Sequence, residues 1–226
     1  MARVKRRKDI IRDPEEIVSI SSKLIDYARE NLERLKLIGI IALILLVGIG
    51  GVVLYLRYEN RKGLELYNKG YVRFSKFIRS GDEKELSKSE KILERVMDKY
   101  SHSKATLPAT CQLAYIKFRE KRWDEAIGLY RRFLENIGND SPYTPFARLC
   151  ISACYEQKGE YLKAEEILKD LKGSTTGYLK QQVMLSLARI YRLTGRPKES
   201  REISQEFVRL FPDSPFLYIA KEYLRS

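Results

Sequence analysis

The sequence has little of what enzymes and metal sites need. It contains one histidine, one tryptophan and three cysteines among 226 residues. Histidine is the commonest general base and a frequent metal ligand, so its scarcity removes the usual starting point for acid–base catalysis. The stretch at residues 172–177 (KGSTTG) follows a predicted helix and lacks the order of a phosphate-binding loop. We therefore predict a protein that is not an enzyme and that has no cofactor and no metal ligands.

The three cysteines form no recognisable metal or redox motif. Cys111, Cys150 and Cys154 include no C-x-x-C pair and have no histidine at ligand spacing. Cys150 and Cys154 lie four residues apart on one face of a predicted helix, but two thiols cannot complete a tetrahedral metal site. We expect small buried side chains. The odd count leaves at least one thiol unpaired within the chain, which argues mildly against a strongly oxidising compartment.

The net charge of +13 comes from 43 basic and 30 acidic residues. Residues 1–36 hold ten Lys or Arg against seven Asp or Glu, and the basic residues beyond position 56 are likewise mixed with acids. A nucleic-acid interface concentrates its basic residues on one face or in a recognised motif. We therefore interpret the excess as a mildly basic, solvated surface, and we do not predict nucleic-acid binding.

Charged residues are missing altogether from residues 37–56 (LIGIIALILLVGIGGVVLYL). As a helix, twenty residues span about 30 Å, the thickness of a bilayer core. The stretch has no polar stripe, unlike a helix packed in a soluble core. A cleaved signal would be shorter and followed by a small-residue cleavage site, and a lipoprotein would offer a cysteine next. The sequence therefore predicts one transmembrane helix that stays in the mature protein.

The tail, residues 1–36, indicates the orientation of this helix. Six of its first twelve residues are basic, and positive charge in short flanks tends to stay cytoplasmic. We expect the tail inside and residues 57–226 outside, although Arg57, Arg61 and Lys62 make the far flank basic too. Asp13 and Pro14 predict the start of an amphipathic helix, which fits either lying on the inner leaflet or docking a cytoplasmic partner.

Self-similar segments follow in the second half of the chain. Their aligned positions hold leucine, tyrosine, alanine, glycine or proline, and they are Leu113 and Ala126 in the first segment; Tyr155, Gly159, Tyr161 and Ala164 in the second; Leu187, Tyr191, Gly195 and Pro212 in the third. The pattern resembles the tetratricopeptide repeat, whose small residues mark close helix contacts and whose glycine ends the first helix. Ala126, Ala164 and Ser200 are spaced 38 and 36 residues apart, close to the usual 34.

The resemblance implies an all-α fold, in which a transmembrane helix is followed by a tetratricopeptide-repeat α-solenoid. We place a divergent helix pair at 62–100, repeats at about 104–136, 142–172 and 178–211, and a closing helix at 215–225. Ser141 and Ser214, each followed by proline, are predicted to cap the helices that begin there.

Stacked helix pairs present their first helices on a concave face that suits protein binding. By repeat alignment we predict that this groove includes Tyr115, Phe118, Arg119, Phe146, Leu149, Gln157, Arg189 and Arg192. We expect about half of them to pack against a neighbouring helix instead. Reversing the charge of Arg189 and Arg192 together is predicted to weaken binding and to preserve helicity.

The order of basic tail, single span, divergent pair and repeats resembles the YfgM-type ancillary subunits of the bacterial SecYEG translocon. The resemblance implies an inner-membrane protein with a cytoplasmic N-terminus and a periplasmic domain. Its partners would be translocon subunits, periplasmic chaperones or exported chains. Two alternatives remain open: an envelope scaffold for outer-membrane assembly, cell division or polysaccharide export, and a membrane-bound regulator whose tail contacts nucleic acid.

Overall fold

The computed structural model describes residues 25–138 and 140–225, and within them the regular secondary structure is helical, with no strand. The predicted all-α fold class is confirmed. The predicted helix start at Asp13 and most of the basic tail lie outside the described residues. The chain divides into two compact units, Met1–Arg57 and Tyr58–Ser226, and each is described by itself.

The first unit contains the whole apolar stretch of α2, a helix from Leu32 to Ser80. Among the described residues, α2 alone is long and apolar enough to cross a bilayer, with a mean hydropathy of 3.0 over its most apolar window. None of that window is buried, and its large side chains are 40–69% exposed. A core helix of a soluble domain would bury such residues, so this stretch is not part of the core of the second unit.

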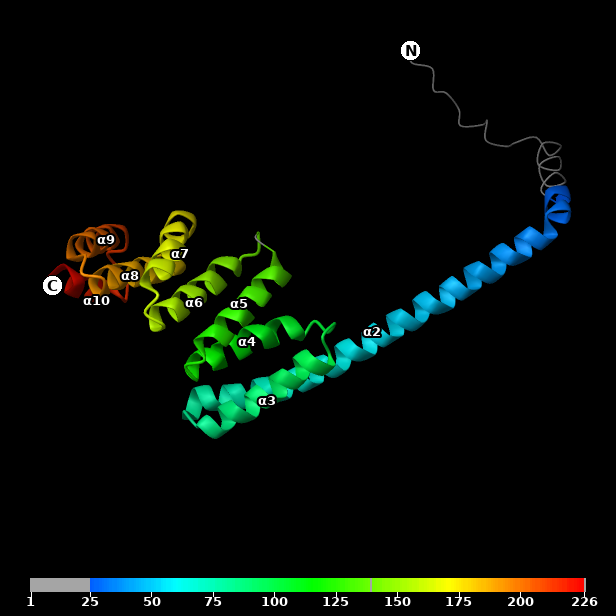
Figure 1. Ribbon diagram of the computed structural model, residues 1–226, viewed down its shortest axis with the longest axis horizontal. Helices are drawn as coiled ribbons and strands as arrows, with labels where there is room; N and C mark the ends of the chain where they lie inside the picture. Colours follow the sequence, from blue (N-terminus) through cyan, green and yellow to red (C-terminus); the bar gives the residue numbers. More distant parts are fainter. Residues whose placement is uncertain (1–24, 139, 226) are drawn as a thin grey trace, which may run out of the picture. The chain divides into compact units, whose positions relative to one another are not determined.

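The second unit is a row of antiparallel helix pairs (Figure 1). In chain order its helices are the end of α2, then α3 (Glu83–Lys99), α4 (Thr106–Arg119), α5 (Trp123–Ile137), α6 (Thr144–Gln157), α7 (Tyr161–Ser174), α8 (Gly177–Leu193), α9 (Pro197–Leu210) and α10 (Leu217–Arg225). From α3 onward each helix packs against the next one in the chain. The fold is therefore an α-solenoid in which every pair relies on its neighbours to cover its apolar faces.

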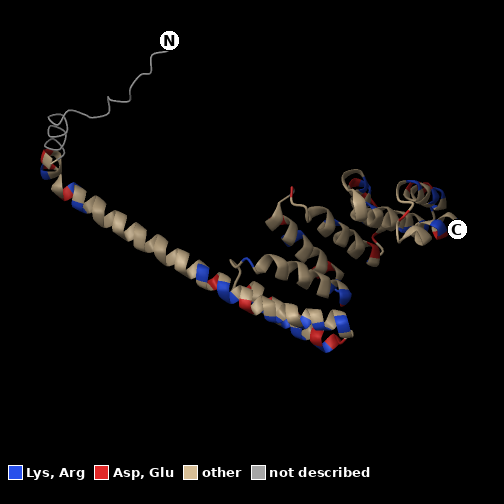
Figure 2. Ribbon diagram, turned by 180° about the vertical axis from the view of Figure 1, so that it is seen from behind, with Lys and Arg blue, Asp and Glu red and all other residues tan. Residues whose placement is uncertain are grey.

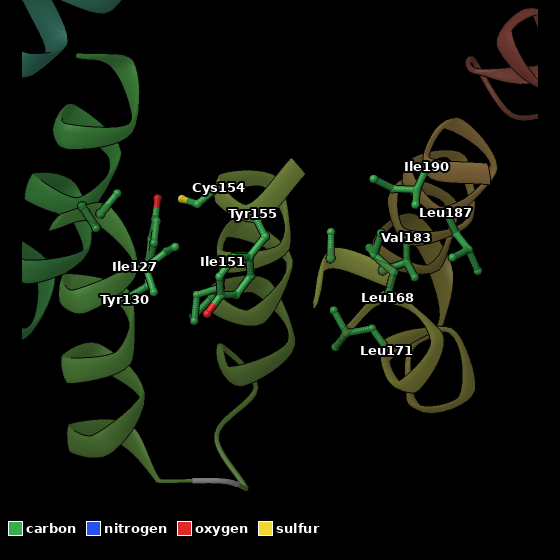
Figure 3. Close-up of a cluster of buried hydrophobic side chains, with 14 of the residues drawn as sticks. Ile127, Tyr130, Ile151, Cys154, Tyr155, Leu168, Leu171, Val183, Leu187 and Ile190 are labelled. Atoms are coloured by element: carbon green, nitrogen blue, oxygen red, sulfur yellow. The ribbon is translucent and has the colours of Figure 1, made fainter. Parts of the chain in front are cut away.

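The positions that align between repeats have the structural roles expected of them. Ala126 and Ala164 are completely buried, which lets the two helices of a pair approach closely. Figure 3 shows the larger side chains that fill the space between successive pairs, such as Ile127 and Tyr130 of α5, Ile151 of α6 and Leu187 of α8. These residues belong to one continuous core that runs from α4 to α8.

The turns between paired helices are only partly as predicted. Gly159 and Gly195 have φ of 77° and 70°, the left-handed conformation in which glycine avoids a steric penalty. In the first repeat the corresponding turn uses Lys121 with φ of 63°. A side chain with a Cβ is strained there by about 1–2 kcal/mol.

The predicted capping serines are misplaced. Helix α6 begins at Thr144 and α10 at Leu217, each three residues after the serine, and no serine side chain caps α6. Instead Ser141 Oγ accepts the Tyr143 N–H at 3.4 Å and Ser214 Oγ accepts the Phe216 N–H at 3.1 Å. The hydroxyls close local turns before the helices, because serine bonds an amide two residues ahead as readily as it caps a helix.

We expect Lys121→Gly to stabilise the domain by about 0.5 kcal/mol, since relief of the left-handed strain exceeds the extra chain entropy of glycine. Gly159→Lys, its mirror substitution, should destabilise the domain by about 1 kcal/mol, because no neighbouring atom lies near the added Cβ and only the backbone penalty remains. Urea denaturation followed by circular dichroism measures both. Destabilisation by Lys121→Gly would contradict the assignment of strain to this turn.

Candidate protein-binding surface

We define the first-helix layer as the first helix of each pair together with the closing helix. Its members are α2, α4, α6, α8 and α10. Side chains join neighbours along it. The rings of Phe74 on α2 and Tyr115 on α4 meet edge to face with centroids 5.6 Å apart. Further along, the Arg192 guanidinium on α8 lies 4.8 Å from the ring centroid of Tyr223 on α10. Each helix pair contributes one helix to this layer.

The second helices are tied to the following pair by a recurring ion pair. Arg122 Nη1 lies 3.0 Å from Glu90 Oε1, and Arg196 Nη1 lies 3.1 Å from Glu165 Oε1. Each arginine directly precedes the second helix of its own repeat. Each glutamate directly follows the aligned small residue in the second helix of the preceding pair. Hydrogen bonds from Arg196 lower the pKa of the buried Glu165 carboxyl, with Lys169 adding to the effect. These pairs fix the register of successive repeats.

Three of the eight predicted groove residues are engaged in packing. Tyr115 is half-buried against Phe74. Phe118 packs edge to face on Trp123 at 5.0 Å between ring centroids, within the first repeat. Leu149 is partly buried against the core that runs from α4 to α8. Their contacts to other helices limit what they can offer to a partner.

Three others are exposed. Arg119, Phe146 and Gln157 lie at the surface of α4 and α6, and the Phe146 side chain is 47% exposed. Arg119 lies 5.7 Å from the ring centroid of Phe77 and 3.7 Å from Glu83, itself exposed. Exposed pairs of this kind contribute little to stability, so Arg119 is free to exchange Glu83 for an acidic partner.

The last two are arginines with partners inside the domain. Arg189 on α8 donates two hydrogen bonds, of 2.6 and 2.8 Å, to the carboxylate of Glu156 on α6, and these bonds raise its pKa. Glu156 is 9% exposed. A glutamate at position 189 would face this buried carboxylate, so the double charge reversal suggested by the sequence would disturb the fold as well as any binding. Arg192 is an exposed residue whose guanidinium lies against the ring of Tyr223.

The structure adds a stripe on α2 that the repeat alignment does not identify. Leu64, Tyr71 and Ile78 are exposed and recur every seventh residue, so they lie along one side of the helix. Tyr71 and Ile78 also line, with Phe74 and other residues of α2, an open cavity of about 550 Å³. The seven-residue spacing was visible in the sequence, but the divergent first pair offered no aligned repeat positions from which to place it.

A larger open cavity, of about 940 Å³, lies on α5, α6 and α7. Its polar centre is Tyr155, whose hydroxyl accepts a 2.8 Å hydrogen bond from Arg131 and whose ring lies 5.3 Å from Lys163 Nζ. None of the eight predicted groove residues lines it. In the second repeat, Glu160 takes the position that Arg122 and Arg196 have in the first and third repeats. The junction between the first and second repeats therefore lacks the arginine–glutamate ion pair.

The three cysteines and the possible metal ligands were the remaining candidates for a reactive site among the described residues. Burial raises the pKa of Cys150 to about 11 and of Cys154 to about 12, and it raises that of Cys111 as well. Thiols of such high pKa are protonated at neutral pH and are poor nucleophiles. Within residues 25–138 and 140–225 no group of three His, Cys, Asp or Glu side chains could hold a metal ion.

Comparison with known proteins defines the class of fold. Residues 182–214, most of α8 and all of α9, match the tetratricopeptide repeat family. A crystal structure from Podosopora anserina, described as a kinesin light chain with nearly identical TPR-like repeats, is similar with a TM-score of 0.52 and 16% identity, over 75% of this chain and 83% of that one. A tetratricopeptide repeat protein from Parabacteroides merdae is similar with a TM-score of 0.58 and 17% identity, over 73% of this chain and 59% of its own.

No curated protein sequence matches this chain. The second unit therefore has a tetratricopeptide-repeat fold by its structure and by one matched repeat. Repeats of this kind indicate a protein–protein interaction scaffold, and proteins built from them are in general not enzymes.

Because Arg189 neutralises a buried carboxylate, we expect Arg189→Ala to destabilise the domain by about 1 kcal/mol. This is the low end of the cost of an uncompensated buried group, because Arg189 itself is half-exposed. Arg192→Ala removes only a cation–π contact at the surface and should cost about 0.5 kcal/mol or less. Urea denaturation of the two variants measures the difference. Equal losses would show that the Glu156–Arg189 pair has no special role.

Proposed function

We propose that the protein is anchored in a membrane by α2 and that its first-helix layer binds extended segments of other proteins. The single observation that carries the proposal is the uncharged stretch of residues 37–56, which leads within the same helix into the repeat domain. Water does not favour twenty exposed apolar residues, whereas a bilayer core of the same length does.

The binding half of the proposal rests on the exposed side chains of the first-helix layer. Tyr71 and Ile78 on α2 and Phe146 on α6 expose apolar surface. Arg119 on α4 and Arg192 on α8 are also exposed and add guanidinium groups to the layer. Aromatic residues and arginine are the residue types that dominate binding energy in protein interfaces. A segment with apolar and acidic side chains is the partner that this surface complements.

The more specific role follows from the resemblance to YfgM-type translocon subunits. In that role the repeat domain lies in the periplasm of a bacterial inner-membrane protein and links exported chains or their chaperones to the translocon. The basic tail supports a cytoplasmic N-terminus. The segment 211–216 (FPDSPF), which resembles junctions of outer-membrane assembly and Tol-system proteins, favours the alternative of an envelope scaffold.

Co-purification of tagged full-length protein in mild detergent, with bound proteins quantified by mass spectrometry, tests the proposal. We expect Tyr71→Ala with Phe146→Ala to reduce capture by about tenfold or more, because exposed aromatic anchors contribute on the order of 1–2 kcal/mol each. The matched control is Leu162→Ala with Leu210→Ala, which removes exposed apolar side chains from the second helices α7 and α9, outside the layer.

Enrichment of translocon subunits or periplasmic chaperones would support the export role, and enrichment of division or outer-membrane assembly proteins would support the envelope scaffold. Equal capture by both double variants would show that the first-helix layer is not the binding surface. Extraction of the protein from membranes by alkaline carbonate would contradict the anchor.

A further inference from the structure

Basic side chains from two helices converge on a small cleft at the beginning of the second unit. The cleft has a volume of about 220 Å³ and lies between the segment of α2 that starts at Tyr58 and the end of α3. Lys62 and Lys69 line it from α2, and Arg95 and Lys99 line it from α3. Figure 2 shows how Lys and Arg return on α2 immediately after its uncharged stretch.

The positive charge of this cleft is not balanced by its own acids. Glu65 is its single carboxylate, and it lies 3.3 Å from Lys62 Nζ and 3.0 Å from Lys69 Nζ, which together lower its pKa. Arg95 and Lys99 have no carboxylate partner among the described residues. Four cations therefore face one anion, and their mutual repulsion favours the binding of a further anionic group.

Two tyrosines give the cleft the composition of a membrane interface. Tyr58 and Tyr100 line it together with the lysines. Tyrosine is enriched where an apolar body meets a polar headgroup layer. The cleft thus combines ammonium and guanidinium donors for a phosphate with aromatic rings suited to the headgroup region.

The loop after α3 is held at this place by hydrogen bonds to α2. Glu59 Oε1 accepts the His102 N–H at 3.0 Å, and Asn60 Oδ1 accepts the Lys104 N–H at 3.0 Å. The end of α3 is therefore fixed beside the first residues of the domain. Lys62 follows Leu56, the last residue of the apolar stretch, by six residues of one helix, which corresponds to about 9 Å of helix rise. The headgroup regions add about 5–8 Å on each side of the core, so Lys62 lies at the outer edge of this layer, and its side chain is long enough to reach back into it.

We propose that this cleft binds the phosphate of an anionic phospholipid in the membrane that holds α2, a proposal that rests on the anchor proposed above. The cations of Lys62, Lys69, Arg95 and Lys99 favour a headgroup with a net negative charge. They disfavour a zwitterionic headgroup, whose own ammonium they repel. Lipid binding also explains why the far flank of the apolar stretch is basic, although the tail is the more basic end.

Native mass spectrometry of the full-length protein in detergent, titrated with phosphatidylglycerol or phosphatidylcholine, tests the cleft directly. We expect phosphatidylglycerol to bind about tenfold more tightly, since each basic residue near an anionic lipid contributes on the order of a fewfold to tenfold. Arg95→Gln with Lys99→Gln should remove this preference. Both side chains are exposed, so helicity measured by circular dichroism should not change.

The matched control is Lys198→Gln with Arg209→Gln, which removes two exposed charges from α9 and should keep the preference. Equal binding of the two lipids, or equal loss in both double variants, would overturn the proposal. Displacement of phosphatidylglycerol by inorganic phosphate at equal concentration would also overturn it, because the site would then recognise free phosphate.

Carbonate extraction of membranes that contain the same protein separates this proposal from the proposed function. Protein that resists extraction but shows no lipid preference would leave the anchor standing and remove the lipid site. Protein that is extracted would remove the anchor, and the lipid site would fall with it.

Discussion

The fold depends on one constraint: a pair of helices cannot bury its apolar face alone, so each pair must stack on the next. Close stacking requires small residues where the helices meet, and Ala126 and Ala164 supply them. It also requires a fixed register, and the ion pairs Arg122–Glu90 and Arg196–Glu165 supply that at two of the junctions. The exposed surface of the first-helix layer follows from this stacking.

The same constraint explains where the domain is open. The junction between the first and second repeats has Ile127 where the other junctions have the glutamate, and Glu160 where they have the arginine. An open cavity of about 940 Å³ lies on the helices that meet there. Within residues 25–138 and 140–225, no helix pair precedes the first pair in the chain. Solenoids usually protect such an end with polar residues, whereas α2 keeps Tyr71 and Ile78 exposed. Apolar surface at an end of a repeat array indicates a place where another molecule can bind.

Short sequence patterns predicted the features that depend on residues close together in the chain. The absence of charge in residues 37–56 was sufficient to predict a long apolar helix, and spaced small, aromatic and glycine residues were sufficient for the solenoid class. Gly159 and Gly195 have the expected left-handed backbone because helix ends need it. That the apolar helix crosses a membrane stays a prediction, as does the side on which the repeat domain lies.

The features that the sequence did not predict depend on residues far apart in the chain. Arg189 bonds to Glu156, 33 residues away, and no periodicity within α8 reveals that partner. Tyr115 occupies a groove position by alignment, yet it packs on Phe74, 41 residues earlier in the chain. The stripe on α2 was missed because the first pair is divergent, and the basic cleft because it forms only when α3 folds back on α2.

Site-specific photo-crosslinking in living cells tests the central claim, that the first-helix layer of a membrane-anchored solenoid is a protein-binding surface. A photoreactive amino acid would replace Tyr71, Phe146 or, on α7 outside the layer, Leu162, all exposed residues. The account predicts crosslinks from positions 71 and 146 to the same partner proteins in the membrane fraction, and few from position 162. Crosslinks mainly from position 162, or recovery of the products in the soluble fraction, would contradict it.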